Sequence, residues 1–242
     1  MAATTDAFLD RLTAAPGEAA IFLDFDGVLA PIVDRPEDAY PPPETRAELR
    51  RLLGRYALLA VVSGRDGGDV RERVGVEGIV YVGSHGLELD RQAARWRQQI
   101  ADFASNAAWR ASEIELKGLS VAFHFRDRPD EAAAVVELEA IAESARDAGL
   151  TARFGRKVLE VLPPVGSNKG TAVTHLLEGA GLTRALVAGD DTTDLDAFRA
   201  VEGLENKVRV AVIAEESPTL LVEHAEIVLA STGEFLELLR KL

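Results

Sequence analysis

The sequence contains no cysteine and one methionine, and aromatic residues make up only 6% of it. Without cysteine the chain forms no disulfide and has no thiol nucleophile. No apolar run approaches the length of about 18 residues that a membrane-spanning helix needs, and the N-terminus lacks the basic and apolar regions of a secretory signal. Because redox arguments say nothing about the compartment, a cytoplasmic location without membrane contact is the default expectation.

Positive charge is also scarce. The chain has 27 Lys and Arg against 40 Asp and Glu, which gives a net charge of −13. A nucleic-acid-binding protein needs a basic face to displace counterions from phosphates, so nucleic acid is not an expected partner. The same acidity repels small anions at long range. A site for a phosphate ester must therefore contain its own local positive charge.

The 242 residues, 47% of them hydrophobic, are enough for one large domain or a core with an insert. Short apolar runs alternate with helical patterns, which predicts an α/β fold, a doubly wound, Rossmann-like parallel sheet. Helices are expected from about Pro43–Thr45 to Leu53 and from Ser167–Asn168 to Gly181. The predicted strands are Ile21–Leu23, Leu58–Val62, Ile79–Val82, Ala185–Ala188, Val208–Ile213 and Ile227–Leu229.

The alternation of strands and helices stops in the middle of the chain, so we expect residues 1–89 and 165–242 to form the core and residues 90–164 an inserted α+β domain. The segment Pro163–Gly166 is typical of a boundary. The elements predicted in the insert are a helix over Gln98–Ser112, a strand pair Glu113–Leu116 and Leu119–Phe125, a long amphipathic helix around Val135–Ala145, and one strand Arg153–Leu162.

A pair of carboxylates follows the first predicted strand. Asp24 and Asp26 come directly after the apolar run and are followed by Gly27. Ligands of open α/β sheets bind beyond the carboxyl ends of the strands, and strand alternation directs both side chains to one face. A hard dication with oxygen ligands, such as Mg²⁺, relieves this concentration of negative charge. The competing interpretation is an ordinary Asp-Gly turn.

A second acidic cluster follows the strand at Ala185–Ala188. Four acidic residues lie within the seven positions after Gly189 and its strand, namely Asp190, Asp191, Asp194 and Asp196. The alternative role, a helix N-cap, requires a single carboxylate. The larger number of acidic residues favours the completion of a metal site.

Two further motifs supply groups that bind phosphate. Ser63 and Gly64 end a predicted strand with a hydroxyl and a backbone N–H, and Arg65 adds a fork of donors for the phosphate or the sugar. Lys169 opens a predicted helix, where the helix dipole disfavours a cation, so a nearby anion is expected. An ordinary Ser-Gly turn and a solvated surface lysine are the alternatives. All four motifs lie at strand ends or helix starts, which favours one shared site.

With these four motifs in this order, the chain resembles the haloacid dehalogenase (HAD) superfamily of phosphatases, and the insert occupies the position of its C2-type cap. A narrower resemblance is to the trehalose-6-phosphate phosphatases. Two positions depart from that family's usual pattern, Val28 in place of threonine and Leu195 in place of glutamate. The resemblance is carried by Leu23–Ile32, Val62–Arg65, Gly83–Glu88, Lys157–Pro163, Asn168–Gly170 and Gly189–Asp194.

The resemblance implies Mg²⁺-dependent hydrolysis of trehalose 6-phosphate to trehalose and phosphate through an aspartyl-phosphate. Asp24 is then the nucleophile and Asp26 the proton donor to the leaving sugar. Ser63 and Lys169 hold the equatorial phosphate oxygens as negative charge develops on them.

The same resemblance implies a ligand set for the metal. Mg²⁺ is expected on the Asp24 carboxylate, the backbone carbonyl of Asp26 and the carboxylate of Asp190. Asp191 and Asp194 are expected behind them, where they orient Lys169 or metal-bound water.

The cap is expected to select the sugar and exclude water. An exposed strand edge is the alternative explanation for Lys157 and Glu160, and a structural role is the alternative for His124. The expected substrate-binding residues are Gly64, Arg65, His85, Glu88, Arg126, Lys157 and Glu160.

Two other functions stay open. The first is an HAD phosphatase for a related sugar or pseudo-sugar phosphate. The second, of a different class, is a catalytically silent phosphate-binding domain, which the Asp24/Asp26 pair disfavours because binding alone needs no proton donor. A monomer is expected.

Overall fold

The computed structural model describes residues 2–110, 113–155, 157–214 and 217–242, with side chains from residue 6 onward. The chain divides into two units, one formed by Met1–Gly86 with Ser167–Leu242 and the other by Leu87–Gly166. Within the described residues, no helix has the length and apolar character needed to cross a membrane.

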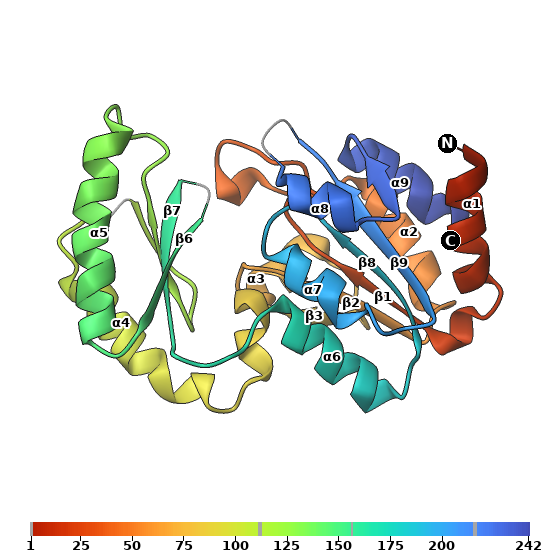
Figure 1. Cartoon of the computed structure of the whole chain (residues 1–242), viewed down its shortest axis with the longest axis horizontal. Helices are drawn as coiled ribbons and strands as arrows, with labels where there is room; N and C mark the ends of the chain where they lie inside the picture. The colour runs from red at the N-terminus through yellow and green to blue at the C-terminus, as the bar shows by residue number, and fades with distance from the viewer. Residues whose placement is uncertain (1, 111–112, 156, 215–216) are drawn as a thin grey trace. The chain divides into compact units, whose positions relative to one another are not determined.

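The first unit is built on a six-stranded sheet in the order β10-β9-β8-β1-β2-β3, and every neighbouring pair is parallel (Figure 1). This arrangement confirms the predicted doubly wound α/β fold. The strands coincide with the apolar runs of the sequence to within one or two residues. They are β1 (Ala19–Leu23), β2 (Leu58–Val62), β3 (Val80–Val82), β8 (Arg184–Gly189), β9 (Asn206–Val212) and β10 (Ile227–Leu229).

The strand order reverses at β1. The chain runs outward from β1 through β2 to β3, and later returns to the other side of β1 as β8, β9 and β10. In register, Leu23 of β1 pairs with Val61 of β2 and with Ala188 of β8. The three strands therefore end together at the topological switch point, where doubly wound sheets bind ligands.

Helices cover both faces of this sheet. On one face, α1, α2, α3 and α9 bury their apolar side chains with β1, β2, β8 and β9 in a single core. Figure 1 shows α6, α7 and α8 over the other face. The helices are α1 (Ala2–Thr13), α2 (Pro43–Leu53), α3 (Gly67–Val74), α6 (Lys169–Ala180), α7 (Asp194–Ala200), α8 (Thr219–His224) and α9 (Thr232–Lys241).

The second unit contains an antiparallel sheet in the order β4-β5-β7-β6, with two helices packed on it. The sequence pattern predicts this α+β arrangement. The elements are α4 (Arg97–Asn106), β4 (Ile114–Leu116), β5 (Val121–His124), α5 (Glu131–Asp147), β6 (Thr151–Gly155) and β7 (Val158–Leu162).

Two predictions for this unit are wrong. The helix expected to reach Ser112 ends at Asn106, and residues 111–112 lie outside the described residues. The single strand expected over Arg153–Leu162 is a hairpin, in which β6 and β7 pair antiparallel. Lys157 has a φ of 55°, a left-handed conformation that ends the extended run. Residue 156, which the prediction placed in the strand, is outside the described residues.

Candidate active site

Asp24 stands at the carboxyl end of β1, at the switch point of the sheet. Its backbone N–H donates to the carbonyl of Ala188 on β8 (3.0 Å), which continues the strand pairing one residue beyond Leu23. The Asp24 side chain is only 6% exposed. A carboxylate at this place is costly to bury unless a charge or a hydrogen bond compensates it.

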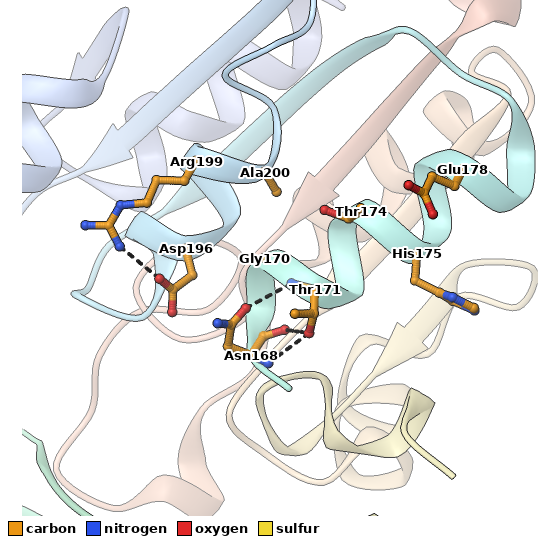
Figure 2. Close-up of a pocket in the computed structure, with 9 residues that line it drawn as sticks. All are labelled: Asn168, Gly170, Thr171, Thr174, His175, Glu178, Asp196, Arg199 and Ala200. Atoms are coloured by element: carbon orange, nitrogen blue, oxygen red, sulfur yellow. Dashed lines mark hydrogen bonds and ion pairs between the residues drawn. The ribbon is translucent and has the colours of Figure 1, made fainter. Parts of the chain in front are cut away.

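Lys169 provides that compensation. Its Nζ lies 2.9 Å from Oδ2 of Asp24 and 2.7 Å from Oδ1 of Asp194, and its side chain is buried. Lys169 is the first residue of α6, and Asn168 caps the helix by accepting from the Thr171 N–H (2.9 Å), while the Thr171 hydroxyl accepts from the Asn168 N–H (Figure 2). This capping box fixes the backbone on which the lysine stands.

Three buried carboxylates meet around this lysine. Oxygens of Asp24, Asp190 and Asp194 lie within 4.8 Å of one another. Asp194 opens α7, and its Oδ2 accepts from the backbone N–H groups of Asp190 (3.0 Å) and Asp191 (3.1 Å). Asp194 therefore ties the end of β8 to α7 and holds Lys169, while Asp24 and Asp190 keep lone pairs for another ligand.

Burial makes the charged forms of Asp24 and Asp190 unfavourable. Desolvation raises the pKa of Asp24, against the opposing effect of Lys169. Desolvation also raises the pKa of Asp190, and the neighbouring negative charges of Asp24 and Asp194 raise it as well. Burial disfavours the charged form of Lys169 as well, but Asp194 and Asp24 outweigh it and hold the pKa of the lysine above its ordinary value.

The donor set fits a divalent cation. One ammonium faces three buried carboxylates, so the cluster lacks positive charge when all of them are ionised. A dication with oxygen ligands supplies that charge and removes the penalty that raises the two aspartate pKa values. This fit rests on the chemistry of the donors and on their burial.

Two glycines make room for the carboxylates. A Cβ on Gly27, whose φ is +76°, would lie 2.3 Å from Oδ2 of Asp190. A Cβ on Gly189 would lie 2.2 Å from Cβ of Asp194. No pattern in the sequence shows which side chains approach these two glycines.

The Asp26 carboxylate pairs with Arg65. The guanidinium makes two parallel hydrogen bonds to it, from Nε to Oδ2 (2.7 Å) and from Nη2 to Oδ1 (2.8 Å). Arg65, which the sequence predicts near the phosphate or sugar, also lies 3.4 Å from Asp69. Because β1 ends at Leu23, strand alternation does not fix the direction of the Asp26 side chain.

The segment after β2 contacts the other predicted site residues of the first unit. Ser63 is buried, and its Oγ accepts from the Arg65 N–H (3.2 Å). The His85 N–H donates to the Ser63 carbonyl (2.8 Å), and the imidazole lies so close to Gly64 that a Cβ there would be 2.6 Å from the ring. Ser63, Gly64 and His85 thus lie together at the carboxyl end of β2.

The predicted sugar-binding residues of the second unit differ in their surroundings. Glu160 is buried on the central strand β7, 2.8 Å from Arg153 and 3.4 Å from Lys117, so the exposed-edge interpretation is wrong for it. Lys157 forms an ion pair with Glu131 at the hairpin. Nε2 of His124, a residue for which a structural role is the alternative, lies 2.9 Å from Oε2 of Glu115.

Glu88 and Arg126 are exposed. Val28 and Leu195, the two departures from the family pattern, are both buried.

A separate surface pocket lies between α6 and α7 (Figure 2). Asn168 and Gly170, the neighbours of Lys169, line it together with Asp196, which pairs with Arg199 (2.9 Å). A Cβ on Gly170 would lie 2.4 Å from the Asp196 carbonyl oxygen, so the two helices pack in backbone contact there. The pocket lining does not include the carboxylate cluster.

Comparison with known proteins agrees with this geometry. The family model described as trehalose-phosphatase matches residues 22–222, which include every residue of the cluster. The chain belongs to this family. The trehalose-phosphate phosphatase of Mycobacterium avium (strain 104) is 39% identical over 207 residues, covering 76% of this chain and 51% of that protein. That of Mycobacterium marinum is 36% identical over 238 residues, covering 84% and 60%.

The chain spans about half the length of the curated relatives that it matches. Solved structures of family members share the fold. The C-terminal domain of Candida albicans trehalose-6-phosphate phosphatase superposes with a TM-score of 0.75 at 21% identity, covering 97% of this chain and 95% of that one. The Aspergillus fumigatus enzyme gives 0.67 at 22% identity, covering 97% and 96%.

Proposed function

We propose that the protein is a Mg²⁺-dependent phosphatase that hydrolyses trehalose 6-phosphate to trehalose and inorganic phosphate. The observation that carries the proposal is the buried cluster of Asp24, Lys169, Asp190 and Asp194 at the switch point, in a member of the trehalose-phosphatase family. The cluster offers a nucleophile, a fixed positive charge and a set of oxygen ligands in one place.

In the first step, a carboxylate oxygen of Asp24 attacks phosphorus and the bond to the sugar oxygen breaks. Asp26 gives its proton to that oxygen, so the sugar leaves as a neutral alcohol. Lys169, held between Asp24 and Asp194, and the Ser63 hydroxyl stabilise the charge on the transferring oxygens.

In the second step, Asp26 is a carboxylate and accepts a proton from water as the water oxygen attacks phosphorus. The bond between phosphorus and Asp24 breaks, phosphate leaves, and both side chains return to their starting states. One carboxyl group thus acts first as acid and then as base, which balances the protons over the cycle.

Mg²⁺ would be held by the carboxylates of Asp24 and Asp190 and by the backbone carbonyl of Asp26. When bound, it supplies positive charge to the phosphate oxygens and allows the buried aspartates to ionise. Asp194 and Asp191 would act from behind these ligands, since Asp194 already orients Lys169.

We assign sugar selection to the second unit, as a cap. Glu160 and Lys157 are the proposed partners of the sugar hydroxyls, with Arg126, Glu88, His85 and Gly64 as further candidates. The burial of Glu160 among two cations supports a fixed orientation for it, which a specific hydroxyl acceptor needs.

Phosphate release with Mg²⁺ across a panel of sugar phosphates tests this function. We expect release from trehalose 6-phosphate to exceed release from glucose 6-phosphate by at least about 100-fold in kcat/KM, because the cap must recognise the second ring. Equal, slow release from every member of the panel would contradict the substrate assignment. No release from any of them, with Mg²⁺ present, would contradict the phosphatase assignment itself.

A further inference from the structure

Arg65 and Asp26 form a pair whose geometry the sequence does not predict. Two parallel hydrogen bonds of 2.7 and 2.8 Å join the guanidinium to both carboxylate oxygens. Such a fork fixes the plane and the rotamer of the carboxyl group, which one hydrogen bond cannot do. The arginine is the more buried partner, at 11% exposure of its side chain against 35% for Asp26.

Arg65 is itself held from other sides. Its guanidinium lies over the ring of Phe25, 5.2 Å from the centroid, and Asp69 of α3 lies 3.4 Å from its Nη1. Asp69 in turn accepts from Nε of Arg73 at 2.7 and 2.8 Å. These contacts leave the guanidinium little freedom to turn toward another anion.

The network reaches beyond α3. Arg73 donates to the backbone carbonyls of Glu37 (2.9 Å) and Ala39 (3.1 Å) and lies over the ring of Tyr40, 5.0 Å from the centroid. Charges therefore alternate along Arg73, Asp69, Arg65 and Asp26, and Arg73 fixes this network to residues 37–40. A network of partly buried ion pairs constrains its members more than a single exposed pair does.

We propose that Arg65 is a positioning residue, which holds the Asp26 carboxyl group for proton transfer, and that it is not a ligand of the substrate phosphate. This inference rests on the proposed phosphatase function. The guanidinium occupies one lone pair of each oxygen of Asp26 and leaves the other lone pairs for the proton. That proton goes to the sugar oxygen as the ester bond breaks, and a proton from water replaces it in the second step.

A positioning role has a kinetic signature. A sugar is a poor leaving group and depends on the proton from Asp26, whereas p-nitrophenol leaves as a stable anion and does not. The value of kcat/KM reports the first chemical step only, before the common dephosphorylation of Asp24. In Arg65→Ala, we expect kcat/KM to fall by about 100-fold for trehalose 6-phosphate and by less than about fivefold for p-nitrophenyl phosphate.

A double-mutant cycle separates action through Asp26 from a general effect. If Arg65 acts only by holding Asp26, Arg65→Ala adds no more than about a twofold loss on trehalose 6-phosphate in the Asp26→Asn background. Arg65→Lys keeps the charge but loses the fork, so it shows the same selective loss and replaces Arg65→Ala if that variant does not fold.

Arg209→Ala is the matched control. The side chain of Arg209, on β9, is also about one-tenth exposed. It forms a forked pair with Glu226, in which Nη2 lies 2.6 Å from Oε1. This variant is expected to lower the melting temperature and to change both substrates equally. A loss of equal size on both substrates in the Arg65 variants, or full additivity with Asp26→Asn, would overturn the positioning role. Absence of Asp24-dependent phosphate release by the wild-type protein on either substrate would instead overturn the proposed function.

Discussion

At the scale of single residues, the site depends on close approaches that only glycine permits. The sequence predicts the aspartates, Ser63 and Lys169 as site residues because carboxylates, hydroxyls and ammonium groups bind metal ions and phosphate. It does not predict that Gly27 must face Asp190, since this contact joins segments more than 160 residues apart. The pairing of Asp26 with Arg65 is not predicted for a related reason, because it joins residues 39 positions apart.

Gly27→Ala and Gly149→Ala form a matched pair, because both glycines have a φ of +76°. An added Cβ at Gly149 meets no atom within 4 Å, so Gly149→Ala should lower stability by only about 1 kcal/mol, the backbone strain, and leave kcat unchanged. At Gly27 the Cβ displaces Asp190, and kcat/KM should fall at least about 100-fold. Thermal melts and phosphate release measure both effects. Equal activity of the two variants would contradict the steric role.

At the scale of elements, periodicity predicts most of what the structure shows. Continuous apolar runs predict the six strands of the parallel sheet. The helix α2 begins at Pro43 and ends at Leu53, as the sequence predicts. The β6–β7 hairpin was missed because its turn lacks an Asn-Gly or Asp-Gly signal and depends on Lys157 in a left-handed conformation. The short helix α7 is not evident from its sequence, where the acidic residues serve the site.

Asn168→Ala tests whether the start of α6 positions Lys169. Loss of the cap should lower the free energy of unfolding by about 1 kcal/mol, and kcat should fall by about tenfold because Lys169 is the next residue. Ser231→Ala is the control, since Ser231 caps α9 by accepting from the Glu234 N–H (3.1 Å). It should have the same effect on stability, measured by urea unfolding, and none on kcat. A similar drop in kcat for both variants would argue against a specific role of the cap.

At the scale of the whole molecule, an acidic protein with a net charge of −13 buries three carboxylates and one lysine at the switch point of its sheet. The composition alone predicts that such a protein needs local positive charge to act on phosphate esters. Lys169 supplies part of it, and the raised pKa values of Asp24 and Asp190 indicate that more is needed.

Stability of the metal-free protein should therefore depend on pH. The folded pKa of Asp24 is raised to about 7 and that of Asp190 to about 9, so the folded state holds protons that the unfolded chain releases. Their contribution to stability is present below the ordinary carboxyl pKa and is lost as the pH rises through about 7 to 9. Mg²⁺ binds the ionised form.

The increase in melting temperature on adding Mg²⁺ should consequently be larger near pH 8.5 than near pH 6, and EDTA should reverse it. In a variant with Asp24→Asn and Asp190→Asn, both the Mg²⁺ effect and its pH dependence should disappear. An equal Mg²⁺ effect at both pH values would contradict the assignment of the cation to these carboxylates.

The central claim is that Asp24 becomes phosphorylated during turnover. The most direct measurement is to quench the reaction with trehalose 6-phosphate and Mg²⁺, reduce the acyl phosphate with borohydride, and sequence the peptides by mass spectrometry. The account predicts homoserine in place of Asp24 in the wild-type protein, and no homoserine in Asp24→Asn or without substrate. Homoserine at Asp190 or Asp194, or an unmodified Asp24 during active turnover, would contradict it.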